Sequence, residues 1–245
     1  MVEAKEGAVK QKNSMWGALK PWIRDLIEVV VEVGVIIVVL KLLLGARMIL
    51  PLVAVTTGSM VHEPGDDMWK TWMTSRGIAI NQVNGFPLQG GFNVGDMIVV
   101  KSPDANLGEV LIYERDKDHS MGGDIPIIHR AVGIAYVEDW EVARTEGTLD
   151  CFTNDTITKY VDVIRNCASI GSKNCPYPSI PKSSSFRLYI TKGDHNIESD
   201  QCSKVMQISY PVNEEQVLGR GFFRIPYIGY LKIIPTMIFR LLLGL

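Results

Sequence analysis

Apolar residues are concentrated in one long run near the N-terminus, residues 26–55 (LIEVVVEVGVIIVVLKLLLGARMILPLVAV). The middle of this run is apolar except for Lys41, and a helix of about 20 mainly apolar residues can cross a bilayer. The pattern therefore predicts a transmembrane anchor over residues 26–48. Glu28 and Glu32 lie one helical turn apart, at the interface or against an interior partner. A long buried helix of a soluble domain is the alternative.

After the anchor the pattern changes to short runs of β-branched and aromatic residues, bounded by glycine and proline. No stretch of this region shows a long helical period, so we expect a mainly β domain over residues 49–224. The predicted strands are residues 96–102, 109–114, 126–137 and 187–191.

Two stretches of the β domain do not fit the strand pattern and are predicted to be insertions. One covers about residues 61–92 and the other about residues 140–185. The first contains two tryptophans and two methionines, whose side chains either enter a membrane interface or pack as a small satellite core. These four residues are Met68, Trp69, Trp72 and Met73.

The C-terminal residues 225–245 are again apolar, but polar residues recur there every four positions. Lys232, Thr236 and Arg240 would form one stripe on a helix, and Pro235 interrupts the first turns. We expect an amphipathic segment in the membrane interface, with a second, poorly formed span as the alternative.

Charge and length limit the class of protein. The chain has 245 residues, a formal net charge of -2 and a mean hydropathy of +0.12. It has no basic cluster of the kind that binds nucleic acid. Lysines are concentrated in a leader of residues 1–25, which predicts a cytoplasmic N-terminus and an extracytoplasmic domain at the cell membrane. A cleaved signal peptide is disfavoured, because no clear small-residue cleavage site ends the apolar run.

All four cysteines fall within the predicted external domain, at positions 151, 167, 175 and 202. Their spacings and the lack of histidine partners argue against a zinc site. Four cysteines allow three pairings, and the sequence does not choose between a short-loop Cys167–Cys175 disulfide and free buried thiols. The Asn154-Asp155-Thr156 tripeptide is a glycosylation pattern, which is accessible only on an exported loop.

Candidate chemistry begins at Ser59, in the segment VAVTTGSM that follows the apolar run. A serine hydroxyl becomes nucleophilic when a base within hydrogen-bond reach takes its proton. His129, in the strand-like segment IIHR, has the side chain suited to that task. An aspartate must then orient the imidazole ring, and Asp194 and Asp200 in TKGDHNIESD are available.

These motifs resemble type I signal peptidases, in the archaeal and endoplasmic-reticulum branch that uses a histidine base. The similar segments are the anchor, VAVTTGSM, GDMIVV, GEVLIYE, IIHRAVGI and TKGDHNIESD, which occur in the family's order. They cover about half of the chain, and the two insertions have no counterpart. The resemblance implies a β catalytic domain with a membrane tether and no metal or other cofactor.

By this resemblance Ser59 is the nucleophile, His129 the base and Asp200 the third member, with Asp194 as a supporting residue or alternative orienter. The Ser59 N–H and the Thr57 hydroxyl are expected to form an oxyanion hole. The pockets for small substrate side chains are expected to be lined by Val55, Met60, Ile127 and Ile128.

The sequence also departs from the family pattern. The family has a proline soon after the serine and methionine, whereas Val61, His62 and Glu63 precede Pro64 here. His62 and Lys101 are the rival bases. The spacing disfavours His62, and an expected solvated position at a strand end disfavours Lys101, because a lysine base must be desolvated.

The function predicted from these residues is a membrane-bound serine endopeptidase that removes signal peptides from exported preproteins. The expected partners are those signal peptides, membrane lipid and the export translocon, without nucleic acid. A non-catalytic, membrane-tethered β domain that assists protein export is the alternative. A self-cleaving repressor is excluded by the anchor.

Overall fold

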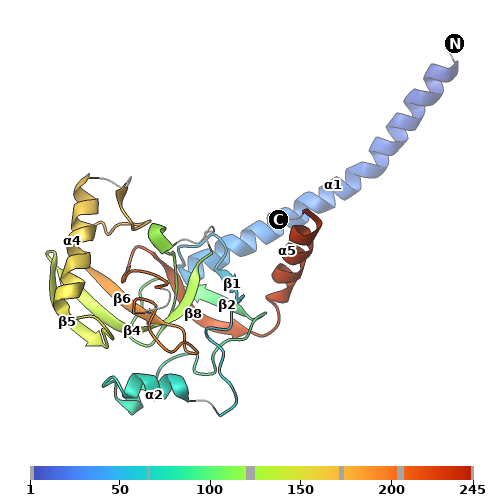
Figure 1. Ribbon diagram of the computed structural model, residues 1–245. Helices are drawn as coiled ribbons and strands as arrows, with labels where there is room; N and C mark the ends of the chain where they lie inside the picture. Colours follow the sequence, from blue (N-terminus) through green and yellow to red (C-terminus); the bar gives the residue numbers. More distant parts are fainter. Residues whose placement is uncertain (1–2, 66, 120–124, 171–173, 203–206, 244–245) are drawn as a thin grey trace. The chain divides into compact units, whose positions relative to one another are not determined.

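The computed structural model describes residues 3–65, 67–119, 125–170, 174–202 and 207–243 (Figure 1). It divides into two units, Met1–Leu43 and Leu44–Leu245. The described part of the first unit is one helix, α1 (Glu3–Leu44), which ends at the first residue of the second unit. In the described part of the chain, no helix combines the length and apolarity that crossing a bilayer requires.

The second unit is built on one sheet of eight strands, and every strand pairing is antiparallel. The strand order is β1-β2-β8-β3-β4-β6-β7, and β5 pairs with β4 off this path. The strands are β1 (Leu52–Ala54), β2 (Met97–Lys101), β3 (Val110–Tyr113), β4 (Ile127–Glu138), β5 (Glu141–Gly147), β6 (Phe186–Lys192), β7 (Val212–Asn213) and β8 (Val217–Ile225).

The mainly β architecture and the four predicted strands are confirmed, because β2, β3, β4 and β6 match them to within one residue at every end. β4 is the longest strand and pairs with β3, β5 and β6. Its residues are buried almost throughout, which explains why this segment is a continuous apolar run rather than an alternating one.

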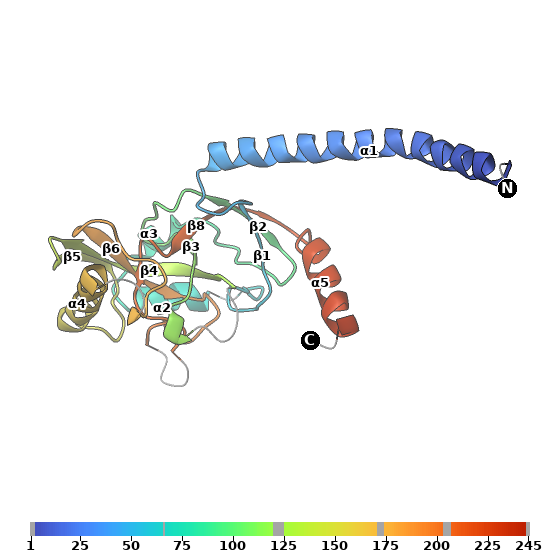
Figure 2. The same cartoon turned by 90° about the horizontal axis from the view of Figure 1, so that it is seen from above.

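The absence of helical periodicity in the β domain was a wrong prediction. Residues Asn154–Ile170 form α4, a helix whose apolar side chains recur on one face. Ile157, Val161 and Ile164 are fully buried in the main core. Figures 1 and 2 both show α4 beside the β5 and β6 end of the sheet. Charged residues between these positions hide the period when the segment is scanned for apolar runs.

The two regions expected to be insertions are packed into the domain. The first contains α2 (Met68–Thr74) and α3 (Ile80–Asn84), and Trp69 and Met73 are buried in the main core cluster. Of the two alternatives for these aromatic residues, packing is the one observed for Trp69. The second region contains α4 and also β5, which extends the sheet beside β4.

The C-terminal helix α5 (Tyr230–Leu243) contains Pro235 and packs near β1. The ring of Tyr230 lies against Gly95, where an added Cβ atom would meet a ring carbon at 2.0 Å. Gly95 also has a φ of +90°, so its position favours glycine for two reasons. A short 3-10 helix, η1 (Lys117–His119), completes the regular elements.

The packing of α4 gives a test of the helix that the sequence pattern did not reveal. Ile164→Ala removes a fully buried side chain and should lower the free energy of unfolding by about 2–5 kcal/mol. Val163 is 37% exposed, and Val163→Ala should change stability by no more than about 0.5 kcal/mol. Denaturant unfolding of the full chain measures both values, and equal effects would contradict the packing described here.

Candidate active site

Ser59 lies in the loop that follows β1, at the end of a segment fixed by backbone hydrogen bonds. The Val55 N–H donates to the Asp96 carbonyl at 2.9 Å, and the Ser59 carbonyl accepts from the His195 N–H at 2.9 Å. The Val61 N–H donates to the Gly58 carbonyl at 3.1 Å, which makes a tight turn around the serine. The Ser59 side chain is therefore held at the rim of the sheet and remains half-buried.

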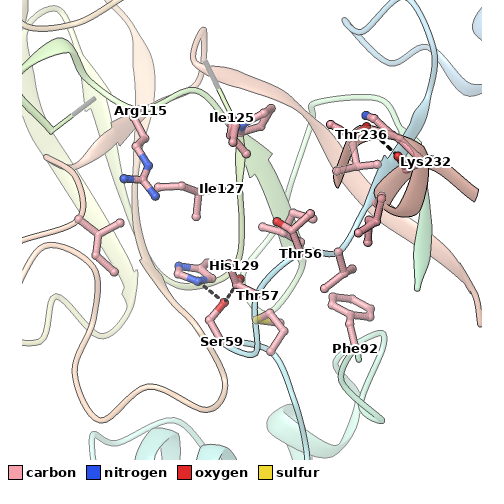
Figure 3. A pocket seen from close by; sticks show the side chains of 18 of the residues that line it. Thr56, Thr57, Ser59, Phe92, Arg115, Ile125, Ile127, His129, Lys232 and Thr236 are labelled. Atoms are coloured by element: carbon pink, nitrogen blue, oxygen red, sulfur yellow. Dashed lines mark hydrogen bonds between the residues drawn. The ribbon is translucent and has the colours of Figure 1, made fainter. Parts of the chain in front are cut away.

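His129 projects from β4 toward this loop and is hydrogen-bonded at both ring nitrogens. Nε2 lies 2.8 Å from the Ser59 Oγ, and Nδ1 lies 2.6 Å from the Asp200 Oδ2 (Figure 3 shows the serine and the histidine). An ionised carboxylate can only accept, so Nδ1 carries the proton and Nε2 accepts from the serine hydroxyl. The His129 ring is 5% exposed, so its orientation is fixed by packing as well as by hydrogen bonds.

Two buried hydroxyls hold the Asp200 carboxylate, and the sequence did not reveal either of them. Tyr113 donates to Oδ2 at 2.9 Å and Thr191 donates to the same oxygen at 2.7 Å. Burial, together with the charge of Asp200, raises the pKa of Tyr113 well above its ordinary value. The phenol therefore remains a donor. Both residues lie in strands that the sequence predicts, but only the β3–β4–β6 order brings them to Asp200.

Asp194 is not in contact with His129 in the described hydrogen bonds. Its carboxylate binds the buried Arg130 guanidinium, with Nη2 at 2.6 Å and Nε at 2.9 Å from its oxygens. His62 Nε2 lies 2.9 Å from Oδ2 of the same carboxylate, and its ring stacks on Trp69. Burial alone would raise the pKa of Asp194, but the charge of Arg130 and the hydrogen bonds from His62 and Arg130 lower it to about 2.

The rival bases occupy other environments. His62 is engaged by Asp194, and the Lys101 ammonium lies 4.6 Å from the centre of the Phe222 ring. Neither residue lines the cleft at Ser59. A further lysine, Lys192, is buried behind the site and donates to the Gly193 and Asp194 carbonyls. Burial lowers the pKa of Lys192 to about 8, against the opposing effect of Asp194.

An apolar cleft of about 810 Å³ opens beside Ser59 and His129 (Figure 3). Residues 53–57 and residues 125–128 both line it, and together they contain three of the four predicted pocket residues. The fourth, Met60, also lines the cleft. The Thr57 Oγ1 lies 3.4 Å from the Ser59 Oγ, which brings the predicted oxyanion-hole residues side by side.

Five polar residues that line the cleft were not predicted to belong to it, namely Thr56, Arg115, Asn196, Lys232 and Thr236. Arg115 and Lys232 are its two cations among the described lining residues, and Thr236 lies beside Lys232 on α5. The Thr236 hydroxyl donates to the Lys232 carbonyl at 2.7 Å. The polar positions at 232 and 236 of the C-terminal segment therefore line the same space as Ser59.

The Arg130–Asp194 pair makes a prediction about acid stability. The pKa of Asp194 falls from 3.8 to about 2 on folding, so the charged form is the one that folding favours. Its contribution is present above about pH 4 and is lost as the pH falls toward 2, which amounts to about 2 kcal/mol. Unfolding free energies measured from pH 7 to pH 2 should therefore fall more steeply in the wild type than in Asp194→Asn.

Asp67→Asn is the matched control for that experiment, because the Asp67 side chain is 71% exposed. Its stability curve should run parallel to that of the wild type. A parallel curve for Asp194→Asn as well would show that Asp194 is not stabilised in the way its contacts indicate.

Comparison with known proteins adds an independent line of evidence. No protein-family model matches the chain. It is similar to the "Signal peptidase complex catalytic subunit sec11" of Aspergillus oryzae, with 28% identity over 173 residues, covering 68% of this chain and 71% of the relative. The protein of the same name from Aspergillus terreus is 28% identical over 172 residues with the same coverage. These relatives confirm the resemblance that the motifs predict, because both are named as catalytic subunits of a signal peptidase complex.

Proposed function

We propose that this protein is a serine endopeptidase that cleaves signal peptides from exported preproteins. The observation that carries the proposal is the hydrogen-bonded series Ser59–His129–Asp200 at the side of an apolar cleft. The names of its relatives support the substrate class. The hydrogen-bonded series indicates a serine hydrolase, and the relatives' name indicates a signal peptide as the substrate.

In the proposed reaction the Ser59 Oγ attacks the carbonyl carbon before the scissile bond. His129 Nε2 takes the hydroxyl proton and returns it to the leaving amine, so that an acyl-enzyme forms and the mature protein departs. Water then attacks the ester, and His129 takes a proton from the water and returns it to the Ser59 Oγ as the ester bond breaks, so that the signal peptide leaves with a new carboxyl terminus. Asp200 holds the ring and stabilises the imidazolium, while Tyr113 and Thr191 fix the carboxylate.

The Ser59 N–H and the Thr57 hydroxyl are the donors that we assign to the oxyanion. The short distance between the Thr57 and Ser59 hydroxyls supports this assignment, because the oxyanion forms next to the attacking oxygen. One such donor lowers the barrier by about 3 kcal/mol in serine proteases.

An extended peptide fits the cleft better than a folded substrate. Residues 53–54 of β1 pair only with β2, and residues 127–128 of β4 pair only with β3, in the described part of the sheet. Each segment therefore has an edge to which a peptide backbone can add. Side chains of Val55, Met60, Ile127 and Ile128 would limit the size of the residues that enter, which suits the small residues before a signal-peptide cleavage site.

The membrane tether is part of the proposal. Between Trp22 and Leu43 the valines, isoleucines and leucines of α1 are largely exposed, on all sides of the helix. Such a surface is stable against lipid and unstable in water. This stretch also carries Glu28, Glu32 and Lys41, and α1 falls short of the apolarity of an ordinary span. We nevertheless propose that it lies in the bilayer, with the basic leader in the cytoplasm and the catalytic domain outside. The tether would hold the enzyme and the signal peptide at one surface.

Loss of the proposed nucleophile or base should abolish cleavage without unfolding the domain. Ser59→Ala and His129→Ala should each reduce kcat by about 10⁴-fold or more, because either group alone leaves the other without its partner. The assay uses the full chain in lipid vesicles with a preprotein that carries an Ala-x-Ala site, and sequencing of the product identifies its new N-terminus. Full activity in either variant would refute the assignment.

Two controls make this experiment specific. His195→Ala should retain activity, because the exposed ring is removed and the main-chain N–H that binds the Ser59 carbonyl is kept. A preprotein with phenylalanine in place of the alanine before the scissile bond should remain uncut. Activity in native membranes but not in the purified chain would indicate missing companion subunits, as in a complex of the kind that the relatives' name describes.

The tether predicts resistance to extraction. The full chain should remain with vesicles at alkaline pH, whereas Val35→Glu with Val38→Glu should be released. Each charge in the middle of a span costs about 2.5–3.5 kcal/mol or more. Both side chains are 57% exposed, so neither substitution disturbs a protein core. Complete extraction of the wild type would show that α1 does not anchor the protein.

A further inference from the structure

Asp200 differs from Ser59 and His129 in how its backbone is held. It lies in the long connection between β6 and β7, outside any strand or helix. Its N–H donates to the Thr191 carbonyl at 2.8 Å, and its carbonyl accepts from the Ile208 N–H at 2.9 Å. Since the carboxylate must stay within hydrogen-bond distance of His129, the position of this connection matters to the reaction.

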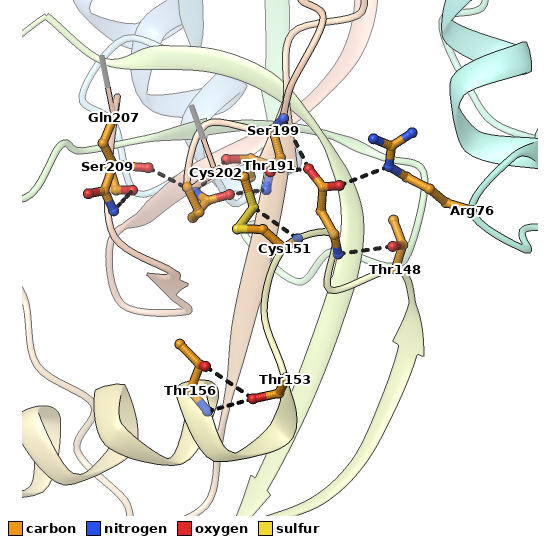
Figure 4. Close-up of a disulfide and its surroundings, with 12 residues drawn as sticks. Arg76, Thr148, Cys151, Thr153, Thr156, Thr191, Ser199, Cys202, Gln207 and Ser209 are labelled. Carbon is orange, nitrogen blue, oxygen red and sulfur yellow. Dashed lines mark hydrogen bonds and ion pairs between the residues drawn. A yellow bond between two sulfur atoms is a disulfide. The ribbon is translucent and has the colours of Figure 1, made fainter. Parts of the chain in front are cut away.

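A disulfide ties the connection to another part of the domain just after Asp200. Cys202 is bonded to Cys151, in the loop between β5 and α4, with a Cα–Cα distance of 5.7 Å (Figure 4). The Cys151 N–H also points to the Cys202 Sγ, at 3.2 Å. The bridge therefore fixes the chain two residues beyond the carboxylate.

Just before Asp200, a hydrogen bond ties the connection to Asp150, which precedes Cys151 in the loop between β5 and α4. The buried Ser199 hydroxyl donates to the Asp150 Oδ2 at 2.8 Å. The Arg76 Nε donates to the other carboxylate oxygen of Asp150 at 2.8 Å, which keeps Asp150 in place. Adjacent residues 150 and 151 thus bind residues 199 and 202, on the two sides of Asp200.

We infer that the Asp150–Ser199 hydrogen bond and the Cys151–Cys202 disulfide form a clamp that positions Asp200 against His129. None of the four residues lines the cleft, so they are positioning residues and not catalytic ones. The inference rests on the proposed function, because it concerns the acid of the proposed triad. It assigns a role in the reaction to the loop between β5 and α4.

The geometry explains why the clamp is needed in addition to the inner contacts. The Asp200 N–H binds Thr191 of β6, Gln201 binds Thr191 through its amide, and the Asp200 carbonyl accepts from Ile208 of the same connection. Tyr113 and His129 hold the carboxylate and not the backbone, so among these described backbone contacts β6 is the one element outside the connection. A segment held along one line can pivot about it. The clamp adds a second attachment from a different loop, and a shift of about 1 Å at a catalytic group can cost about 100-fold in rate.

The chain has its own matched control. The second disulfide, Cys167–Cys175, closes a short loop at the end of α4 and binds no residue next to Asp200. Both bridges contribute to stability by restricting the unfolded chain. Only the first is expected to affect the geometry of the imidazole.

The test compares two double variants of the full chain, well below the melting temperature of each. The first carries both Cys151→Ser and Cys202→Ser, and the second carries both Cys167→Ser and Cys175→Ser. The downfield proton resonance of the His129 Nδ1–H reports its hydrogen bond to Asp200 without any substrate. In the first variant this resonance should shift upfield or disappear, and kcat should fall about tenfold or more while KM stays within about twofold. The second variant should match the wild type in both measurements.

Ser199→Ala, with both disulfides intact, tests the other half of the clamp and decides the question if the first disulfide variant does not fold. It should weaken the same resonance and lower kcat, and Ser199→Thr, which keeps the hydroxyl, should restore both. An unchanged resonance in folded clamp variants, or the same loss in both disulfide variants, would overturn the inference. Because the resonance needs no substrate, it decides this even if the wild type fails to cleave signal peptides.

Discussion

The buried ion pair between Arg130 and Asp194 connects several parts of this domain that are far apart in the sequence. The guanidinium binds the carboxylate that follows β6, and its remaining N–H groups donate to the carbonyls of Pro87, Leu88 and Gly108. Trp69 of α2 lies against the guanidinium plane, 4.6 Å from its carbon. A buried charge must be fully satisfied, so the segments that supply these groups cannot move independently.

This pair also explains why His129 and Arg130 are adjacent. Successive side chains of a strand point to opposite faces, so one step along β4 separates the two groups and sends them to two different aspartates. Asp200 meets the imidazole and Asp194 meets the guanidinium. The two carboxylates that the motif TKGDHNIESD offers as alternatives therefore have separate tasks. One binds the ring at the cleft, and the other holds together the structure behind it.

The sequence predicted the parts of this arrangement that depend on local pattern and chemical type. Ser59, His129 and Asp200 were identified by residue type and family resemblance, and β2, β3, β4 and β6 by their β-branched runs. Tyr113, Thr191 and Arg130 were not predicted, because their roles depend on strand order and register. Helix α4 was missed because its buried positions 157, 161 and 164 are separated by charged residues. The pairing of Cys151 with Cys202 is likewise a product of the tertiary fold.

The insertion after Ser59 leaves and re-enters the domain at almost the same point. The Phe92 N–H donates to the Met60 carbonyl at 2.8 Å, so the two ends of residues 61–91 are joined beside the serine. Doubling the length of a loop whose ends are already joined costs only about 0.6 kcal/mol of closure entropy. The exposed positions of residues 61–91 can therefore change in number and in side chain while Ser59 stays where it is, whereas Trp69, Pro87 and Leu88 are held by Arg130. A family with a fixed reaction centre could acquire different surfaces at this one position.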